Sequence, residues 1–289
     1  MRLSAIIVIY QPEITELIKN IAGVINAVDQ LILYQNSSIA DQLIFYEAYL
    51  NLPHKDKITF LGTGDNVGIA TALNMGVKWS LENDYTHILT LDQDSYFEPG
   101  VLTSYKLLIS QQNDDRIGVF GINPVCGNSF LFEVADQVLE VTDTITSGSI
   151  FPLNIFNECG LFMDELFIDA VDYEFCYRIS KRNGYKTLVF TSILLQHKVG
   201  YVTKTRWGFK TDNYSAFRTY FIVRNHIIMW KRYPEIFPRT YKIVLIKTHI
   251  IGRIIKVFLA ENDKQKKTKA IIIGLIHGLK GRLGYYNVN

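Results

Sequence analysis

The feature that most constrains the fold is an alternation, over residues 3–122, of short apolar runs with segments of helical periodicity. The runs are rich in β-branched residues and have the length of strands. They comprise Leu3 to Tyr10, Gln30 to Gln35, Lys57 to Gly62, His87 to Asp92 and Ile117 to Ile122. Apolar strands that are linked by helices form a mostly parallel sheet covered on both faces. The pattern therefore predicts a Rossmann-like α/β fold, whose ligands bind beyond the carboxyl ends of the strands.

After residue 122 the pattern changes to shorter pieces. A helix is expected from about Phe167 to Gly184, and two strands are expected to follow, in Lys186 to Phe190 and in Ser192 to Gly200. From residue 213 onward the sequence is helical and basic. With 289 residues, 48% of them hydrophobic, the chain is long enough for one large core and an appendage. We expect a first domain over residues 1–212 and a C-terminal helical region over residues 213–289.

Two acids, Asp92 and Asp94, stand where the fourth apolar run ends and a turn begins. Because the strand ends there, both carboxylates can reach one ligand. Oxygen-rich sites of this kind hold Mg²⁺ or Mn²⁺ through one or two protein carboxylates, and water and a diphosphate fill the other positions. The alternative is a solvated polar turn, since turns are rich in Asp.

A second acidic group begins the expected helix and consists of Asp169, Asp172 and Glu174. Acids favour the positive end of a helix, Asp169 suits the N-cap, and Glu174 can pair with Arg178. One of the three acids is not needed for this structural account, and a carboxylate at a helix start can serve as a general base. His197 follows an apolar strand, where imidazole suits both a metal ligand and a structural hydrogen-bonding residue.

Eight stretches together resemble the family 2 inverting glycosyltransferases, and most closely their bacterial rhamnosyltransferase branch. In chain order they read IIVIYQP, QNSS, DNVGIATALNMG, LTLDQDS, TSGSIF, LFIDAVDYEFCYR, QHKVG and RTYFIVRN. They lie within residues 3–225, in the order and at the spacing of the family, and LDQDS with FIDAVDYEFCYR points to the rhamnosyl branch. The resemblance implies the glycosyltransferase A fold, which has a Rossmann-like sheet.

The resemblance also implies roles for particular residues. Asp94 would bind the divalent metal, Mg²⁺ or Mn²⁺, with Asp92 near it and near the ribose, and His197 matches a further metal ligand of some relatives. Asp172 matches the catalytic base, which deprotonates the acceptor hydroxyl for inverting attack at the anomeric carbon. The positions where relatives hold the nucleotide base and ribose are Tyr10, Pro12 and Asn66.

Gln35 departs from the pattern of the family, which usually has Asp at this position to accept from the pyrimidine N3–H. An amide can accept from N3–H and also donate to O4, so Gln35 complements uracil or thymine at two points. A second departure is Val171, where many relatives carry Glu. Val171 removes a like charge beside the expected base, Asp172.

The charge of the chain is unevenly divided. Residues 239–289 hold 11 Lys or Arg and two acids, which gives +9 there and −7 on the rest of a chain whose net charge is +2. Within Tyr241 to Ala260 basic and apolar residues recur at helical spacing. The basic positions are Lys242, His249, Arg253 and Lys256, followed by Lys264, Lys266, Lys267 and Lys269, and the apolar side comprises Ile243, Ile246, Ile250, Ile254 and Val257.

This basic pattern predicts an amphipathic helix that lies on an anionic membrane surface without spanning it. The alternative is a helix that packs on the first domain and exposes its lysines. Nucleic acid is disfavoured as a partner, because the apolar residues form faces and are not isolated stacking aromatics.

The apolar run at Met1 to Tyr10 is shorter than the hydrophobic region of a signal peptide, and the three cysteines lack metal-ligand or disulfide spacing. We therefore expect a cytoplasmic protein, and the basic C-terminal pattern adds that it is peripheral on the inner face of the cell membrane. The family resemblance implies that it transfers rhamnose from dTDP-rhamnose to a saccharide or a lipid-linked saccharide. Two alternatives stay open. One is transfer of another sugar from a UDP donor, and the other is a degenerate homologue that binds nucleotide without turnover.

Overall fold

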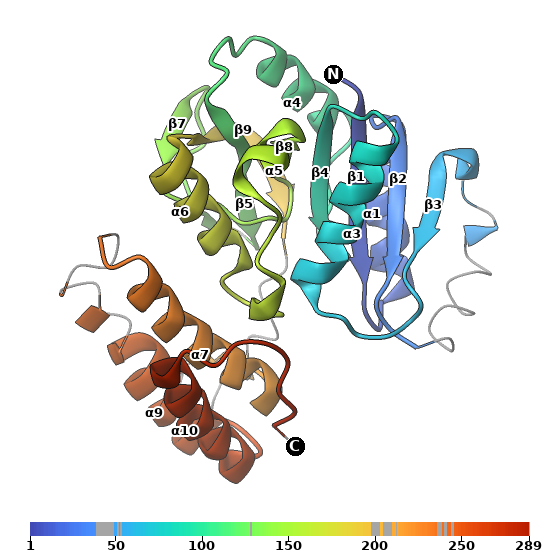
Figure 1. Cartoon of the computed structure of the whole chain (residues 1–289). Coiled ribbons are helices and arrows are strands. Elements are labelled where there is room, and N and C mark those ends of the chain that lie inside the picture. The colour runs from blue at the N-terminus through green and yellow to red at the C-terminus, as the bar shows by residue number, and fades with distance from the viewer. Residues whose placement is uncertain are drawn as a thin grey trace. The chain divides into compact units, whose positions relative to one another are not determined.

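The structure is a computed structural model of the chain (Figure 1). It describes residues 1–38, 49–50, 52, 54–127, 129–197, 203–204, 210–211, 213–235, 239, 242–243 and 246–288. The chain divides into two compact units. The sheet unit comprises Met1–Phe162 and Phe175–Lys198, and the helical unit comprises Met163–Glu174 and Val199–Asn289.

The sheet unit is built on a sheet whose nine described strands include two parallel groups. The strand order is β3-β2-β1-β4-β8-β5-β9-β7, and β6 pairs with β5. The strands are β1 Leu3–Ile9, β2 Gln30–Gln35, β3 Ile58–Leu61, β4 His87–Asp92, β5 Ile117–Cys126, β6 Ser129–Phe130, β7 Val138–Val141, β8 Ile150–Pro152 and β9 Lys186–Gln196. Strands β3, β2, β1 and β4 are parallel neighbours, as are β5 and β9, whereas β8 is antiparallel to both β4 and β5. The expected mostly parallel α/β sheet is confirmed.

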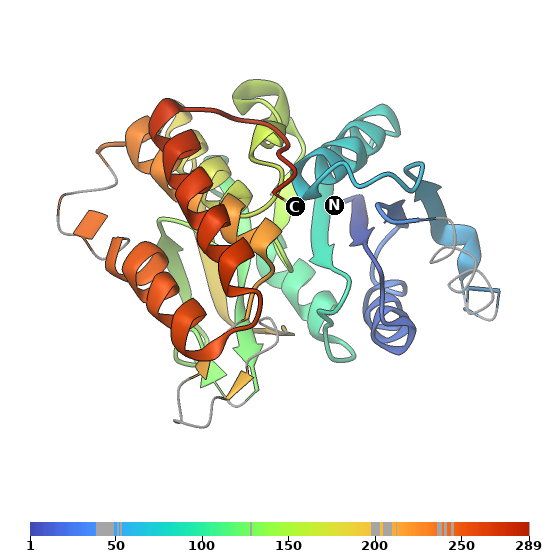
Figure 2. The same ribbon diagram turned by 90° about the horizontal axis from the view of Figure 1, so that it is seen from below.

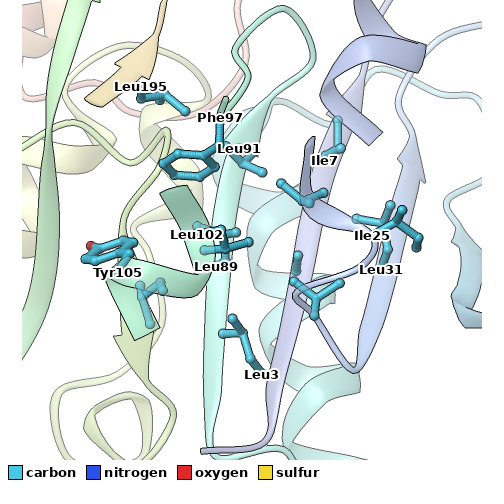
Figure 3. Packing of buried hydrophobic residues seen from close by; sticks show 14 of the residues in the cluster. Leu3, Ile7, Ile25, Leu31, Leu89, Leu91, Phe97, Leu102, Tyr105 and Leu195 are labelled. Carbon is cyan, nitrogen blue, oxygen red and sulfur yellow. The ribbon is translucent and has the colours of Figure 1, made fainter. Parts of the chain in front are cut away.

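Helices cover both faces of this sheet, with α1 on one face and α3 on the other (Figure 2). The helices are α1 Ile14–Val24, α3 Ile69–Glu82, α4 Val101–Ser110 and α5 Asn154–Cys159, with a short 3-10 turn at Lys55–Lys57. Alternate residues of β1 face opposite sides: Leu3 and Ile7 join the core beneath α1 and α4 (Figure 3), whereas Ile6 packs against Gly76 of α3. Burial on both faces explains why β1 reads as a continuous apolar run.

The two strands expected at Lys186 to Phe190 and Ser192 to Gly200 form one strand, β9, which ends at Gln196. The prediction of a strand pair was wrong because Phe190 and Leu194 pair with the adjacent residues Ile122 and Asn123 of β5, so that one strand continues through a bulge that contains Thr191. Its buried hydroxyl donates to the carbonyl oxygen of Ala135 at 2.6 Å, so the polar side chain is satisfied inside the strand. Residues 198–200 of the expected second strand lie outside the described residues.

The helical unit contains the start of α6, Val171–Asn183, whose residues from Phe175 onward belong to the sheet unit. Its other elements are a 3-10 turn Asp164–Leu166, β10 Thr203–Lys204, β11 Lys210–Thr211, α7 Ala216–Arg232, a π-helix Ile246–Ile251, α9 Gly252–Ala260 and α10 Lys264–Lys280. Helix α10 runs beside α7 (Figures 1 and 2). Val257 of α9 and Ile271 of α10 share a buried cluster with Val223 and Ile227 of α7, so the three helices pack as one bundle.

Helix α6 begins four residues later than expected. Phe167, Asp169 and Ala170 have φ angles of +68°, +65° and +65°, which a right-handed helix does not allow. The expected helix start at Phe167 is therefore corrected to Val171.

Two cations of the basic C-terminal pattern point inward. Arg253 and Lys267 are buried and donate to the buried carboxylate of Glu261 at 3.1 and 2.8 Å. The interpretation that these two charges lie on an exposed basic face was wrong, because Glu261 pairs with both of them inside the bundle. The exposed large apolar residues among the described residues of 242–260 are Ile243, Ile251, Ile255, Phe258 and Leu259. Within the described ranges we find no helix with the length and apolar character needed to cross a membrane.

Candidate active site

Asp92 and Asp94 lie in a tight turn at the carboxyl end of β4. The turn is closed by the Ser95 N–H, which donates to the Asp92 carbonyl oxygen at 3.3 Å. The same carbonyl accepts from Asn20 Nδ2 of α1 at 2.7 Å, and the Asp92 N–H donates to Ser147 Oγ at 3.0 Å. Since both backbone groups of Asp92 are held, the turn presents its partly exposed carboxylates from a fixed frame.

His197 lies beside this acidic turn. Tyr96 and Gln196 exchange two backbone hydrogen bonds of 3.0 Å, which bring the end of β9 against the residues that follow the turn. His197 Nδ1 is 2.8 Å from Ser95 Oγ and 3.8 Å from Asp92 Oδ2. The Ser95 contact occupies Nδ1 and leaves Nε2 as the ring nitrogen for a metal. The structure thus brings together Asp92 and His197, which are far apart in the sequence.

The side chains at this turn have the donor chemistry of a Mg²⁺ or Mn²⁺ site. Carboxylate oxygens of Asp92 and Asp94 suit both cations, whereas an imidazole nitrogen such as that of His197 suits a transition-metal ion such as Mn²⁺ better than Mg²⁺. No three His, Cys, Asp or Glu side chains of the described residues gather closely enough to complete a metal site alone. Such a partial set fits a cation whose remaining ligands are water and substrate phosphate oxygens.

Gln93, between the two acids, connects the turn to the loop after β1. Its Oε1 accepts from the Tyr10 N–H at 2.8 Å, and its Nε2 donates to the Tyr10 carbonyl oxygen at 2.9 Å. This two-point pairing continues the parallel contact of β1 with β4 beyond the ends of both strands. The acidic turn and the loop that carries Tyr10 and Pro12 are therefore one connected surface.

The loops after β2 and β3 are joined in the same way. Asn36 Nδ2 donates to Asn66 Oδ1 at 3.3 Å, and Asn36 Oδ1 accepts from the Val67 N–H at 2.9 Å. The Gly64 N–H donates to the Gln35 carbonyl oxygen at 3.1 Å. Gly62 has a φ of +88°, and a Cβ there would lie 2.6 Å from that carbonyl, so only glycine fits. Gln35 and Asn66 thus lie on neighbouring loops at the carboxyl ends of parallel strands.

Four residues that organise these loops were not singled out from the sequence: Asn20, Asn36, Gln93 and Ser147. Each acts by hydrogen bonds to backbone or to another loop, and three of them stand in or beside motifs already quoted. Asn20 carried the clearest signal, because it is a polar residue on the buried face of α1. Its partner, the Asp92 carbonyl, is 72 residues away and could not be read from a local pattern.

Asp172 belongs to the helical unit, in the first turn of α6. Its Oδ1 accepts from the N–H of Tyr173 at 3.0 Å, and the residue is partly exposed. Asp169 accepts from Arg218 at 3.2 Å, and the fully buried Glu174 accepts from the Tyr233 hydroxyl at 2.6 Å. Burial raises the pKa of Asp169, and the Arg218 guanidinium opposes this rise.

Similarity to solved structures identifies the type of fold. No family model matches the chain. S. aureus TarS 1-349 in complex with UDP-GlcNAc is similar with a TM-score of 0.58 at 15% identity, over 96% of this chain and 81% of that chain. GalNAc-T7 with UDP, GalNAc and Mn²⁺ is similar with a TM-score of 0.54 at 15% identity over 68% of this chain, which spans 43% of that structure. The chain therefore has the fold of the glycosyltransferases of the A type.

A relative in sequence indicates the kind of glycosyltransferase. The chain is 25% identical over 299 residues to the dTDP-rhamnosyl transferase RfbF of Shigella flexneri, a match that covers 97% of this chain and 96% of the relative. The chain is thus a glycosyltransferase with a rhamnosyltransferase relative along nearly its whole length. This confirms the resemblance drawn from the eight sequence stretches.

Proposed function

We propose that the protein transfers a deoxyhexose such as rhamnose from a dTDP-activated donor to a saccharide acceptor, with inversion at the anomeric carbon. The observation that carries the proposal is the full-length match to a dTDP-rhamnosyl transferase. It is supported by the acidic turn, in which Asp92 and His197 meet at the carboxyl end of a parallel strand. This edge is where α/β sheets bind their ligands.

In this proposal Asp94 and Asp92, with His197, hold a Mg²⁺ or Mn²⁺ ion, which when bound supplies positive charge to the diphosphate leaving group. Asp172 accepts the proton of the acceptor hydroxyl as that oxygen forms its bond to the anomeric carbon. The bond from this carbon to the diphosphate breaks on the opposite side, so one displacement inverts the configuration. Asp172 then holds the proton until solvent removes it.

The nucleotide is assigned to the connected loops of the sheet unit. Gln35 would accept from N3–H of the pyrimidine and donate to O4. Tyr10, Pro12 and Asn66 would contact the base and ribose, with Asp92 toward the ribose. The hydrogen bonds of Gln93 and Asn36 support this assignment, since they fix these loops to one another before any ligand binds.

The test is a screen of nucleotide-sugar donors with the purified full chain, with and without Mn²⁺, scored by release of nucleoside diphosphate. We expect turnover of dTDP-rhamnose only with metal, and a loss of at least about a hundredfold in Asp94→Ala and Asp172→Asn. Asp114→Asn, which breaks an exposed ion pair with Lys186, serves as a folded control with normal activity. Full activity of Asp172→Asn would contradict the assigned base.

Two other functions have specific support. The similarity to TarS with UDP-GlcNAc favours a UDP donor, because uracil and thymine present the same edge to Gln35. Competition between dTDP and UDP for binding, followed by turnover of the preferred sugar, separates these donors. Gln35 in place of Asp favours a protein that binds nucleotide without turnover, and binding with no donor consumed across acceptors would establish it.

We further propose that the helical unit lies on the inner face of the cell membrane, where the acceptor is lipid-linked. Two exposed apolar rows support this. One follows α9 with Ile255, Phe258 and Leu259, and the other follows α10 with Ile272, Ile276 and Leu279. The exposed lysines on or next to these helices are Lys264, Lys266, Lys269 and Lys280. Apolar area combined with basic charge is what binds a helix to an anionic bilayer surface.

A further inference from the structure

The backbone just before Asp172 is strained. Phe167, Asp169 and Ala170 all have positive φ, in a stretch of four residues that contains no glycine. A side chain with a Cβ pays a steric cost in this region of conformational space, most of all a bulky one such as Phe. Strained backbone of this kind persists only where the surroundings hold it.

Two adjacent buried side chains of α7 hold this segment by its carbonyl groups. Asn225 Nδ2 lies 3.1, 2.8 and 2.8 Å from the carbonyl oxygens of Leu166, Ile168 and Asp169. Arg224 Nη2 donates to the carbonyl oxygens of Glu165 and Leu166 at 3.1 and 3.0 Å. Four carbonyl groups, those of Glu165, Leu166, Ile168 and Asp169, thus converge on one amide and one guanidinium.

The same face of α7 also holds the side chains of the segment. Arg218 donates to Asp169 Oδ1 through Nε and Nη2 at 3.3 and 3.2 Å. The ring of Phe221 stacks on Phe167 with centroids 5.2 Å apart. Residues 218, 221 and 225 are spaced by three and four positions, so they lie on one side of the helix.

We infer that Arg224 and Asn225 are positioning residues. Together they form a clamp that holds residues 165–170 in the strained form, and this form places Asp172 at the start of α6. This inference rests on the proposed role of Asp172. A helix start needs no such clamp for stability alone, and a fully buried guanidinium costs more free energy than an apolar contact of the same volume. A catalytic role of Asp172 accounts for the arrangement, because the orientation of the base is then worth the free energy of folding that the strained backbone removes.

The test compares Asn225→Asp with Thr219→Val in the full chain. A carboxylate at position 225 has no N–H to share among the three carbonyl groups and repels them. Thr219 is buried on the same helix, but its hydroxyl accepts from Arg253 of α9 at 3.0 Å, so its loss removes a buried hydrogen bond away from the segment. Arg218→Gln is a second, milder variant for the case that Asn225→Asp does not fold. We expect it to fold because the Arg218 side chain is 42% exposed.

Three measurements are made: amide hydrogen exchange over residues 163–175, kcat and donor KM, and the effect of each variant in an Asp172→Asn background. We expect Asn225→Asp to speed exchange of this segment and to lower kcat about tenfold or more, with donor KM within about twofold. In the Asp172→Asn background the same change should cost less than about twofold, since the clamp acts through Asp172. Thr219→Val should leave segment exchange and kcat unchanged.

Unchanged exchange in Asn225→Asp would overturn the inference, as would a kcat loss that is equally large without the Asp172 carboxylate. Normal kcat in Asn225→Asp together with an inactive Asp172→Asn would also overturn it, while the proposed function stands. Full activity of Asp172→Asn would remove the base assignment itself. The failure of the clamp and the failure of the proposed base therefore give different results.

Discussion

Gln35 is the single residue on which the choice of nucleotide depends most. It ends β2, and its own carbonyl accepts from Gly64, so its backbone is fixed. We predict that Gln35→Ala weakens binding of both dTDP and UDP by about tenfold, which corresponds to one or two lost hydrogen bonds to the base. Calorimetric titration measures both affinities.

The matched control for this prediction is Gln30→Ala, at the opposite end of the same strand, where the amide donates to Thr59. It removes a side-chain hydrogen bond without approaching the loops. Equal nucleotide affinity in Gln35→Ala and the unaltered protein would show that the pyrimidine is recognised elsewhere.

His226 makes the stability of the helical unit dependent on pH. Burial, together with the ring of His249 whose centroid is 4.1 Å away, lowers the pKa of His226 to about 3. The unfolded chain binds a proton near pH 6.5 and the folded chain does not, so stability is present at neutral pH and is lost as pH falls below 6.5. From pH 7 to pH 5 this one residue should remove about 2 kcal/mol of unfolding free energy.

Urea denaturation at the two pH values measures the effect. His226→Gln should lose about 2 kcal/mol less on acidification than the unaltered protein, and His54→Gln, at an exposed position, should not differ from it. A pH dependence that is the same with and without His226 would contradict the prediction.

At the scale of elements, the close approach of α10 to α7 depends on two glycines of α10, Gly274 and Gly278. A Cβ added at Gly278 would lie 3.0 Å from the Arg224 carbonyl oxygen and 2.8 Å from Ile227 Cβ, which are groups that cannot move alone. We predict that Gly278→Ala lowers the unfolding free energy by about 1–3 kcal/mol, because overpacking outweighs the gain of about 1 kcal/mol in helix propensity. Thermal unfolding checks the result.

Thr268→Ala on the same helix is the control, since its side chain is only partly buried and Ala is the better helix former. It should be neutral or slightly stabilising. A stabilised Gly278→Ala variant would show that the helices can separate without cost.

The strands of the sheet were more predictable from the sequence than the contacts between elements. Strands β2 and β4 have the expected bounds because burial on both faces leaves a continuous apolar run. The late start of α6 could not be predicted, since positive φ at Phe167 and Ala170 is maintained by α7 and not by local preference. The inward orientation of Arg253 depends likewise on Glu261, a residue that the periodicity of the helix does not include.

The candidate site was predictable to a similar extent. Asp92, Asp94 and His197 could be named because strand ends and motif order mark them. The cross-links by Gln93 and Asn36 could not, because a side-chain amide that bridges two loops leaves no periodic signal. The predicted division between residues 212 and 213 and the roles of the site residues stay predictions.

At the scale of the whole molecule, the charge is divided so that the C-terminal 51 residues are strongly basic and the rest is acidic. Burial of Arg253 and Lys267 against Glu261 removes part of this basic charge from the surface. Attraction to an anionic bilayer must then come from the exposed lysines at about 1 kcal/mol each, together with the exposed apolar rows of α9 and α10. Neither contribution is large, so we expect reversible binding that needs both.

We predict that the full chain binds vesicles of mixed neutral and anionic phospholipid in a sedimentation assay, and that high salt or neutral vesicles weaken the binding. Ile255→Gln with Phe258→Gln should reduce binding at least about tenfold, because two side chains that are each half exposed lose their apolar contact with lipid. Leu107→Gln, at an equally exposed position on α4 of the sheet unit, is the control and should bind normally. Vesicle binding that is unaffected by the double substitution would contradict the membrane proposal. If the double substitution instead abolishes a dimer in solution, the apolar row is an interface between two copies of the chain.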